Sequence, residues 1–250
     1  MEHKNLAPGV DIFLGDCRDT LEAMAFDQMA DLVLTDPPYG IDYQSNTGKK
    51  LANDKEPPLW CIPMMEALMK PDTAMYVFTR WDVYPAWHDE MAGSGLKIKA
   101  PIIWVKGSGG QGDCVADQAL NYEMVLVGHK GRAKLRPWVD HEGWKGRFGF
   151  PPKGTVGKLI NRDDKVWLHN RPKGGTAYVH PTTKPDDLMA RAIVQHTDPG
   201  GLVLDPFMGS GPVGVAAFKT GRRYVGIEVE REYFELAEAN IGQAIEESFR

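Results

Sequence analysis

Short apolar runs alternate with helix-length segments along this chain, and that alternation limits the folds it can adopt. Such an order is typical of a mostly parallel sheet with helices on both faces. The expected strands are residues 10–14, 32–35, 75–79, 102–105, 123–127, 202–204 and 224–227. The expected helices are residues 62–69, 186–196, 213–220 and 232–247. The sequence therefore predicts an α/β fold.

Two stretches interrupt this alternation. Residues 40–60 are polar and rich in turn-forming residues, which predicts a loop. Residues 130–179 are rich in glycine and proline and have weak periodicity. We expect them to form a small irregular insertion between two parts of one domain, residues 1–129 and 180–250.

Composition sets broad limits on the kind of protein. The chain has 250 residues, of which 42% are apolar and 25% charged, in the ordinary range for globular domains. No apolar run approaches the roughly 20 residues that cross a bilayer, and the first residues have no signal-peptide core. The cysteines, Cys17, Cys61 and Cys114, have no metal-site spacing. We therefore expect no membrane segment, no metal, and a reducing, cytoplasmic location.

Charge is unevenly distributed along the chain. Residues 128–175 hold twelve Lys or Arg against four Asp or Glu, a net +8, so the other residues carry −13 of the total −5. A basic segment on an acidic body is the pattern of a protein that binds a polyanion, although a solvated basic insertion would give the same pattern. The expected contacts with such a polyanion are Lys130, Arg132, Lys134, Arg136, Lys145 and Arg147 in this segment, with Lys49 and Lys50 in the expected loop at 40–60.

A glycine-rich turn follows the expected strand at 202–204 and precedes an expected helix. Its residues are Asp205-Pro206-Phe207-Met208-Gly209-Ser210-Gly211. Together with Gly214, the glycines have the spacing of a dinucleotide-binding loop, and Glu228 follows Gly209 by nineteen residues. The turn indicates a nucleotide-type cofactor, with a plain glycine turn as the alternative.

The acidic residue that opens this turn bears on the choice of cofactor. Asp205 would repel a pyrophosphate, but it suits the sulfonium and ammonium groups of S-adenosylmethionine. Phe207 can offer its ring face to the cation. Glu228 can accept hydrogen bonds from ribose hydroxyls. The turn therefore favours S-adenosylmethionine.

The second motif, Asp36-Pro37-Pro38-Tyr39, follows the expected strand at 32–35. Two prolines remove two backbone donors, so carbonyls and the Asp36 carboxylate remain to face a ligand. An exocyclic amino group needs such acceptors, because accepting its hydrogens frees the nitrogen lone pair for attack on a methyl group. Tyr39 can stack on the base. The alternative is a strand-end turn capped by an aspartate.

Taken together, the motifs resemble the β group of amino-directed DNA methyltransferases. They occur in that family's order: Asp36–Tyr39, the basic region, His180-Pro181-Thr182-Thr183-Lys184-Pro185, Asp205–Gly211, and Tyr224–Glu228. The resemblance covers nearly the whole chain. It implies a Rossmann-like sheet of seven strands, one of them antiparallel, with residues 1–129 as the catalytic half. Residues 130–179 would be the target-recognition insertion and residues 180–250 the cofactor-binding half.

The resemblance also implies roles for individual residues. Asp36, Pro37, Pro38 and Tyr39 would be catalytic. Thr182, Thr183 and Lys184 would lie near the methionine end of the cofactor, and Asp16 near its adenine. The full expected cofactor set is Asp16, Asp36, Thr182, Thr183, Lys184, Asp205, Pro206, Phe207, Gly209, Ser210, Gly211 and Glu228.

We expect an adenine-N6 methyltransferase that acts on flipped-out bases in double-stranded DNA. Cytosine N4 is the alternative base, for which the family typically carries Ser in place of Asp36. Methylation at cytosine carbon 5 is disfavoured, because no cysteine follows a proline. A nicotinamide oxidoreductase would leave Asp36–Tyr39 unexplained, and a non-catalytic DNA-binding module would explain the basic region alone. A homodimer and a cognate restriction endonuclease are left open as partners.

Overall fold

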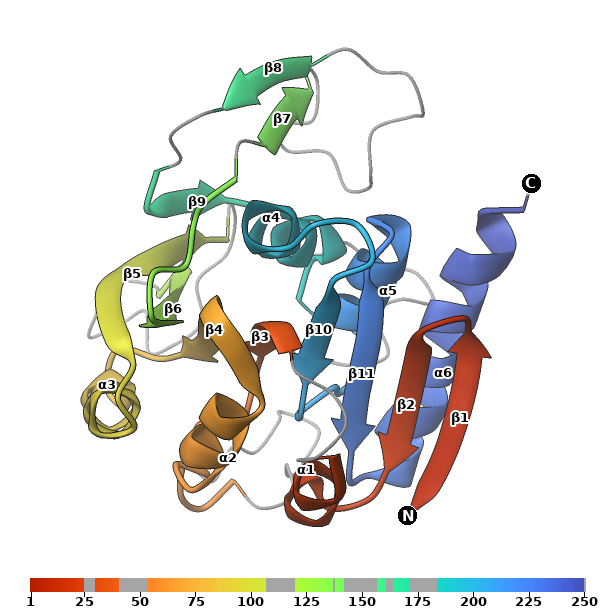
Figure 1. Cartoon of the computed structure of the whole chain (residues 1–250), viewed down its shortest axis with the longest axis horizontal. Helices are drawn as coiled ribbons and strands as arrows, with labels where there is room; N and C mark the ends of the chain where they lie inside the picture. Colours follow the sequence, from red (N-terminus) through yellow and green to blue (C-terminus); the bar gives the residue numbers. More distant parts are fainter. Residues whose placement is uncertain are drawn as a thin grey trace.

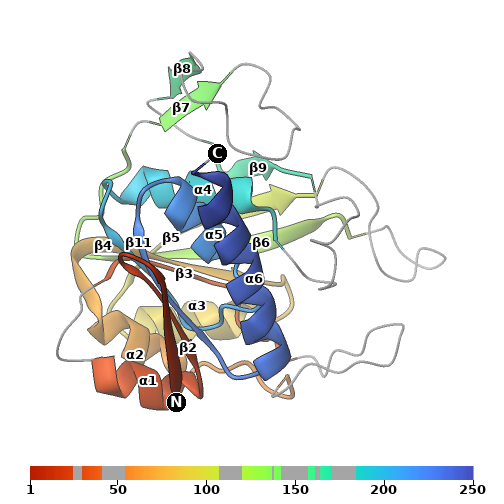
Figure 2. The same ribbon diagram turned by 90° about the vertical axis from the view of Figure 1, so that its right-hand side faces the viewer.

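The computed structural model of the protein describes residues 1–24, 30–40, 54–106, 120–136, 138–141, 157–160, 164–170 and 184–249. These residues form a three-layer α/β/α structure, in which a mixed sheet lies between two groups of helices (Figures 1 and 2). No helix among them is long and apolar enough to cross a membrane.

The main sheet has nine strands in the order β1-β2-β11-β10-β3-β4-β6-β5-β9. Their bounds are β1 Glu2–Ala7, β2 Val10–Leu14, β3 Ala30–Thr35, β4 Met69–Thr79, β5 Lys97–Val105, β6 Tyr122–Lys130, β9 Val166–Leu168, β10 Leu202–Asp205 and β11 Arg223–Glu228. β6 is antiparallel to both of its neighbours, and β1 is antiparallel to β2. All seven expected strands are present, and β1 and β9 extend the sheet at its two edges.

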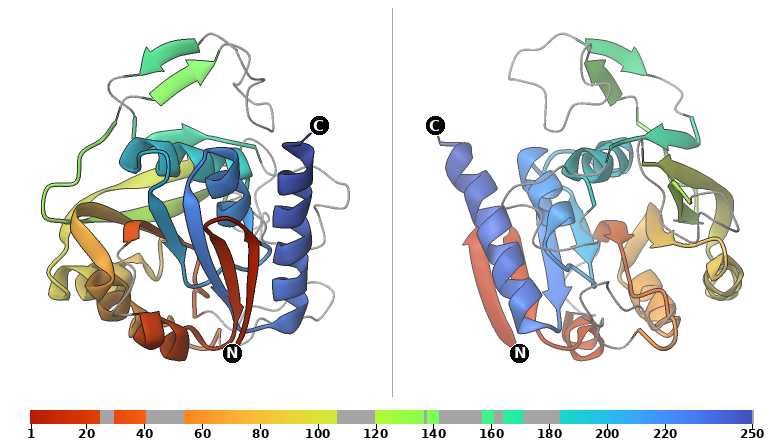
Figure 3. Two further views of the ribbon diagram at one scale, coloured as in Figure 1. Left: turned by 45° about the vertical axis from the view of Figure 1, so that its right-hand side comes forward. Right: turned by 180° about the vertical axis from the view of Figure 1, so that it is seen from behind.

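Helices cover both faces of this sheet. On one face lie α1 Cys17–Met24, α2 Cys61–Ala67 and α3 Tyr84–Gly93. On the other lie α4 Asp186–His196, α5 Pro212–Lys219 and α6 Arg231–Glu247. The four expected helices correspond to α2, α4, α5 and α6; α1 and α3 are additional. Figure 3 shows α6 running beside β1 and β2.

The central strands are buried on both faces, which explains their continuous apolar sequences. In β3, Leu32 and Leu34 pack with α4–α6, whereas Val33 packs with α1–α3. In β10, Val203 packs with α4–α6 and its two leucine neighbours with α1–α3. Residues that alternate in this way leave no solvated face, so both helical layers are required.

Part of the expected irregular insertion has regular structure. β7 Trp138–His141 and β8 Gly157–Ile160 form a separate antiparallel pair, and β9 joins the main sheet beside β5. Figures 1 and 3 place the β7–β8 pair at the end of the molecule opposite α1. The pairing of β9 with β5 shows that the expected insertion is not wholly separate from the sheet.

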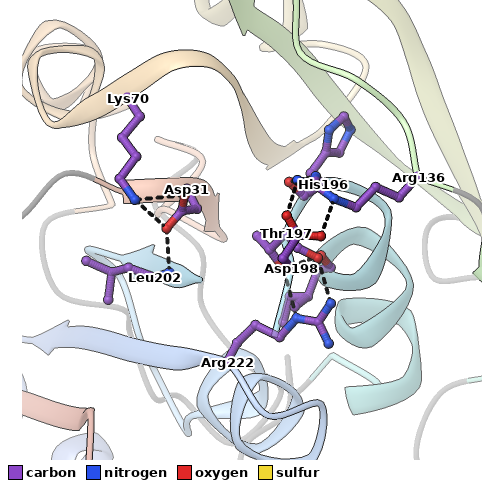
Figure 4. Close-up of polar contacts among 9 residues, drawn as sticks. Asp31, Lys70, Arg136, His196, Thr197, Asp198, Leu202 and Arg222 are labelled. Atoms are coloured by element: carbon purple, nitrogen blue, oxygen red, sulfur yellow. Dashed lines mark hydrogen bonds and ion pairs between the residues drawn. The ribbon is translucent and has the colours of Figure 1, made fainter. Parts of the chain in front are cut away.

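Polar contacts fix the edge of the sheet where the parallel strands begin (Figure 4). Both Asp31 carboxylate oxygens lie 2.8 Å from the Lys70 ammonium, which joins β3 to β4. The same carboxylate accepts the Leu202 backbone N–H at 2.8 Å, which joins β3 to β10. These contacts fix the stagger of the three strands, and therefore the relative position of their carboxyl ends.

Candidate active site

The sheet reverses its order between β10 and β3. From β10 the chain continues through α5 to β11 on one side, and from β3 through α2 to β4 on the other. The two strands are parallel neighbours, with Val203 opposite Leu32 and Leu204 opposite Val33. The carboxyl ends of strands at such a reversal border a crevice where ligands bind. The two sequence motifs begin at these two ends, where Thr35, the residue before Asp36, contacts Asp205 from 170 residues away.

Asp205 connects the two strand ends. The Thr35 hydroxyl donates to its Oδ1 at 2.7 Å, and the Tyr224 hydroxyl donates to its Oδ2 at 3.3 Å. The Phe207 N–H also donates to Oδ1 at 3.3 Å. Asp205 is only 1% exposed, and burial raises the pKa of its carboxyl group to about 7. Within the described contacts Asp205 holds the turn to β3, and its contact with a cofactor stays a prediction.

The glycine turn is hydrogen-bonded to the end of β11 and has free space next to Gly209. Glu228, at the end of β11, accepts the Gly209 N–H at 2.8 Å on one carboxylate oxygen and the Glu230 N–H at 2.8 Å on the other. Gly209 has φ +53°, and a Cβ there would meet no atom within 4 Å. Gly211 has φ +82°, and a Cβ there would lie 3.0 Å from the Cβ of Ala237 in α6. A ligand can therefore approach Gly209, whereas Gly211 packs against the protein.

The remaining residues of the turn fill the space beneath it. Pro206 and Ser210 are buried, and Phe207 is partly buried against the α1–α3 side of the core. The Ser210 carbonyl accepts a hydrogen bond from the Asn240 side chain at 2.9 Å. Burial raises the pKa of the Glu228 carboxyl group. The turn is thus a fixed ledge with two buried carboxyl groups, Asp205 and Glu228, at its base.

Asp16 lies at the end of β2, next to β11. The Gly15 N–H donates to the Glu228 backbone oxygen at 2.9 Å, which sets Asp16 beside that strand end. Its carboxylate accepts from the Arg18 backbone N–H at 2.9 Å and from the Arg18 guanidinium. These hydrogen bonds lower the pKa of Asp16. The guanidinium also lies 5.1 Å from the Trp60 ring centroid. Asp16 and Glu228 therefore lie at the ends of two neighbouring strands, β2 and β11.

Asp36 opens the second motif at the end of β3, with its side chain 25% exposed. Its Oδ1 accepts from the Tyr39 hydroxyl at 2.9 Å, and its Oδ2 binds the Lys184 ammonium. Burial raises the pKa of Asp36, while the charge of Lys184 opposes that rise. Pro37 is buried and Pro38 half-buried. The exit of the motif is fixed as well, because Asp54 accepts the Gly40 N–H at 2.6 Å.

Two further charged residues join this motif, and the sequence-based predictions missed both. Glu123, near the start of β6, lies with its Oε2 3.3 Å from the Lys184 Nζ and 3.2 Å from the Tyr39 hydroxyl. Its Oε1 lies 2.5 Å from the Nζ of Lys106, which follows β5. The available signal was charge at the ends of apolar runs. Because β6 is antiparallel, only the topology shows that its first residues share an edge with the ends of β3 and β4.

Lys184 lies beside the second motif. The resemblance implies a place near the methionine end of the cofactor, which stays a prediction. In the structure its ammonium lies between Asp36 and Glu123, 5.8 Å from the Tyr39 ring centroid and 5.4 Å from that of Phe78. Thr182 and Thr183 lie outside the described residues. Lys184 thus contacts the Asp36–Tyr39 motif directly.

The expected DNA contacts fall into two groups. Lys49, Lys50, Lys145 and Arg147 lie outside the described residues. The others follow β6 to the opposite edge of the sheet, since Lys130 pairs in register with Thr73 near the beginning of β4. Lys130 binds the carbonyl and carboxylate of Glu66 at 2.8 and 3.0 Å.

Arg136 has protein partners at this edge too (Figure 4). Its guanidinium binds both Asp198 oxygens at 2.7 Å and the His196 carbonyl. The side chains of Arg132 and Lys134 are exposed. Lys130 and Arg136 therefore have structural partners, whereas Arg132 and Lys134 are accessible. DNA binding by any of them stays a prediction.

The geometry supports one kind of chemistry. The sheet reversal places the glycine turn, with Asp205 and Glu228 at its base, next to the end of β3, where Asp36 is partly exposed. The ledge suits a cationic ligand, and Asp36 with the proline motif suits a ligand that donates hydrogen bonds. Among the described residues, no group of His, Cys, Asp and Glu is arranged to hold a metal ion.

Known proteins are similar to this chain in sequence and in fold. The sequence pattern of the DNA methylase family matches residues 30–239. The chain is 29% identical over 224 residues to the putative methylase YubD of Escherichia coli K12, a match that covers 88% of this chain and 84% of that protein. It is 32% identical over 145 residues to the type II methyltransferase M2.DpnII of Streptococcus pneumoniae, covering 57% of this chain and 50% of that protein.

Two solved structures have a fold similar to that of this chain. The M1.HpyAVI–SAM complex superimposes with a TM-score of 0.67 at 28% identity, covering 92% of this chain and 98% of that one. The cytosine-N4-specific PvuII DNA methyltransferase has the same fold at 17% identity, with a TM-score of 0.67 and coverage of 95% and 92%. The family match spans most of the chain and includes both strand-end motifs. The chain therefore belongs to the DNA methylase family.

Proposed function

We propose that this DNA methylase transfers a methyl group from S-adenosylmethionine to the N6 amino nitrogen of adenine in double-stranded DNA. The observation that carries the proposal is that the strand ends bearing Asp36 and the Asp205–Gly211 turn are neighbours, joined by the hydrogen bond from Thr35, the residue before Asp36, to Asp205. One motif supplies acceptors for an amino group and the other an acidic ledge for a cationic donor, so the two reactants would lie side by side.

The residues of the ledge fit S-adenosylmethionine. A Cβ on Gly209 would meet open space, and Glu228 binds the Gly209 N–H from the other side. Asp205 opens the same turn, and Asp16 follows the strand next to that of Glu228. Carboxylates favour the cationic amino and sulfonium groups of this cofactor over a dinucleotide's phosphates. The similarity to the SAM-bound M1.HpyAVI structure supports the same assignment. When bound, the cofactor supplies an electrophilic methyl carbon.

Asp36 performs the main task on the base. Its partly exposed carboxylate and the Pro37 carbonyl would accept the two amino hydrogens, which makes the nitrogen pyramidal and frees its lone pair. Asp36 would thus prepare the nitrogen to receive the methyl group that bound S-adenosylmethionine supplies, and would take up the proton that the nitrogen releases. The Tyr39 ring would stack on the base, worth roughly 1–3 kcal/mol.

The base must leave the double helix to reach Asp36, because in a base pair the amino group is stacked inside the duplex and hydrogen-bonded to a carbonyl oxygen of the partner base. Flipping costs a few kcal/mol, which stacking and hydrogen bonding at Asp36–Tyr39 would offset. A cytoplasmic location belongs to the proposal, because the spacing of Cys17, Cys61 and Cys114 predicts a reducing compartment. A homodimer and a cognate restriction endonuclease are compatible with it.

Cytosine N4 is the second candidate acceptor. It presents the same amino group, and the PvuII enzyme shows that this fold accommodates it. Asp36 favours adenine, because the cytosine-directed members that the sequence resembles typically carry serine at that place. Mass spectrometry of nucleosides decides the matter. DNA is incubated with the protein and S-adenosylmethionine carrying a deuterated methyl group, then digested.

We expect labelled N6-methyladenine from the wild type and none from Asp36→Ala. Asp89→Ala is the matched control, because that carboxylate is 83% exposed on α3 and should be dispensable. Labelled N4-methylcytosine would replace the proposed base with the second candidate. Equal labelling by Asp36→Ala and the wild type would refute the proposed chemistry.

A further inference from the structure

A chain of four alternating charges ends at the candidate catalytic carboxylate, Asp36. In order it consists of Lys106, Glu123, Lys184 and Asp36. The side chains of Lys106 and Lys184 are only 6% and 5% exposed, and that of Glu123 is 15% exposed. Buried charges are costly unless they are paired, so the two cations and two anions depend on one another.

Glu123 has both oxygens engaged, each by a different element. Its Oε1 is held by Lys106 from the end of β5, and its Oε2 faces Lys184 and Tyr39. Lys106 therefore orients the Glu123 carboxylate and keeps it charged. The remaining oxygen is directed toward the groups that also bind Asp36.

Tyr39 has one hydroxyl hydrogen and two carboxylate acceptors. Its oxygen lies 2.9 Å from the Asp36 Oδ1 and 3.2 Å from the Glu123 Oε2, so it can donate to only one of them at a time. Lys184 likewise has Asp36 and Glu123 within reach. Each donor that occupies Asp36 thus has a second acceptor nearby.

We propose that Glu123 and Lys106 are positioning residues for methyl transfer, and that Glu123 accepts the donors that Asp36 must release when the substrate amino group binds. Without Glu123, displacing Tyr39 from Asp36 would leave a buried donor unpaired, and Lys184 would remain fully on Asp36. With Glu123, Asp36 exchanges internal hydrogen bonds for those of the substrate. This inference rests on the proposed role of Asp36.

The charge balance gives a signature that a merely structural role would not give. Asp36 must be ionised to accept the amino hydrogens, so the transfer rate falls as the pH falls through its pKa. The groups that face it are Lys184, Tyr39, Glu123 and Asp205. Cofactor and DNA are kept saturating, so that titration of Asp205 acts on binding and not on the measured step.

The acidic limb of the pH–rate profile is the pH range over which the transfer rate falls as Asp36 is protonated. The two single variants should shift this limb in opposite directions. Glu123→Gln leaves two lysines for one carboxylate, which stabilises the ionised form of Asp36 and moves the limb to lower pH. Lys106→Met leaves two carboxylates to share Lys184, which moves the limb to higher pH. A general loosening of the site would move both in the same direction.

The experiment measures single-turnover methyl transfer across a pH series. We expect Glu123→Gln to slow transfer at least about tenfold on the pH plateau, with the Kd for S-adenosylmethionine changed by less than about threefold. The double variant Lys106→Met, Glu123→Gln removes a pair and leaves no lone buried charge, so it guards against unfolding of either single variant. It should be as slow as Glu123→Gln, with its limb near that of the wild type.

A wild-type rate in the double variant, or limbs that shift together, would overturn the inference. Loss of S-adenosylmethionine binding in the double variant would also overturn the inference. It would mean that Lys106 and Glu123 are needed for the folded structure of the site and not for positioning Asp36. Failure of the proposed function is distinguishable. If Glu123→Gln is fully active but Asp36→Ala is inactive, only the inference falls, whereas an active Asp36→Ala removes both.

Discussion

The buried carboxyl group of Asp205 makes folding stability depend on pH in a direction opposite to that of most carboxyl groups. Its pKa is about 7 in the folded protein, compared with an ordinary value of 3.8. The folded state therefore holds this proton at pH values where the unfolded chain has released it. The stabilisation is complete below the unfolded pKa and is lost as the pH rises through the folded pKa.

The perturbation that exposes this effect is Asp205→Asn. Asparagine has nearly the same shape, and its carbonyl can accept from Thr35 and the Phe207 N–H while its amide donates to the Tyr224 oxygen. It carries no charge at any pH. Between about pH 5 and pH 8 the wild type should lose roughly 3 kcal/mol of stability relative to the variant, because the window spans about two pH units below the folded pKa of about 7.

Urea unfolding of both proteins at the two pH values measures this quantity as a difference of differences, in which the other titrating groups cancel. The wild type should lose stability relative to Asp205→Asn as the pH rises. Parallel pH dependences would refute the reasoning, because they would mean that Asp205 is ionised in the folded protein throughout. Asp89→Ala, which removes an exposed carboxylate, is the control and should show no such difference.

Other predictions follow from the same structure. If the positive groups of S-adenosylmethionine lie near Asp205, the Kd for this cofactor should fall as the pH rises through about 7, because Asp205 becomes negatively charged. The Kd should not change with pH in Asp205→Asn, and isothermal titration calorimetry measures both. Gly211→Ala should cost about 2–3 kcal/mol in urea unfolding, because φ is +82° and the new Cβ would press on Ala237; Gly221→Ala, with φ +74° and open space, should cost only about 1 kcal/mol. Replacing both Arg132 and Lys134 by alanine should make the slope of log affinity for DNA against log salt shallower by about 0.9 for each phosphate that the variant no longer neutralises. An unchanged slope would mean that this edge of the sheet does not bind DNA.

The net charge of the basic segment, residues 128–175, does not show which of its charges are already paired within the protein. The net charge of residues 128–175 correctly marks a part of the chain unlike the rest. It does not reveal that Lys130 is paired with Glu66 and Arg136 with Asp198. Ion pairs join residues that are distant in sequence, so a count within one segment includes charges whose partners lie elsewhere.

The missed strands have a physical explanation. β1 is a polar, half-exposed edge strand, so Glu2–Ala7 lacks the apolar run by which buried strands are found. β9 has only three residues, and it forms because the edge of β5 offers it a partner. Local sequence records burial well, but it records pairing poorly when the strand is short or faces solvent.

The sequence by itself determined the α/β class, the central strands and the two motifs that follow β3 and β10, because burial on both faces and tight turns each require particular residues locally. Only the tertiary structure decided that these motifs meet, and that Lys106, Glu123 and Lys184 stand behind Asp36. Strand order and the antiparallel direction of β6 bring those residues together from positions up to 148 apart in the chain. Such proximity is a property of the sheet topology, and no local pattern encodes it.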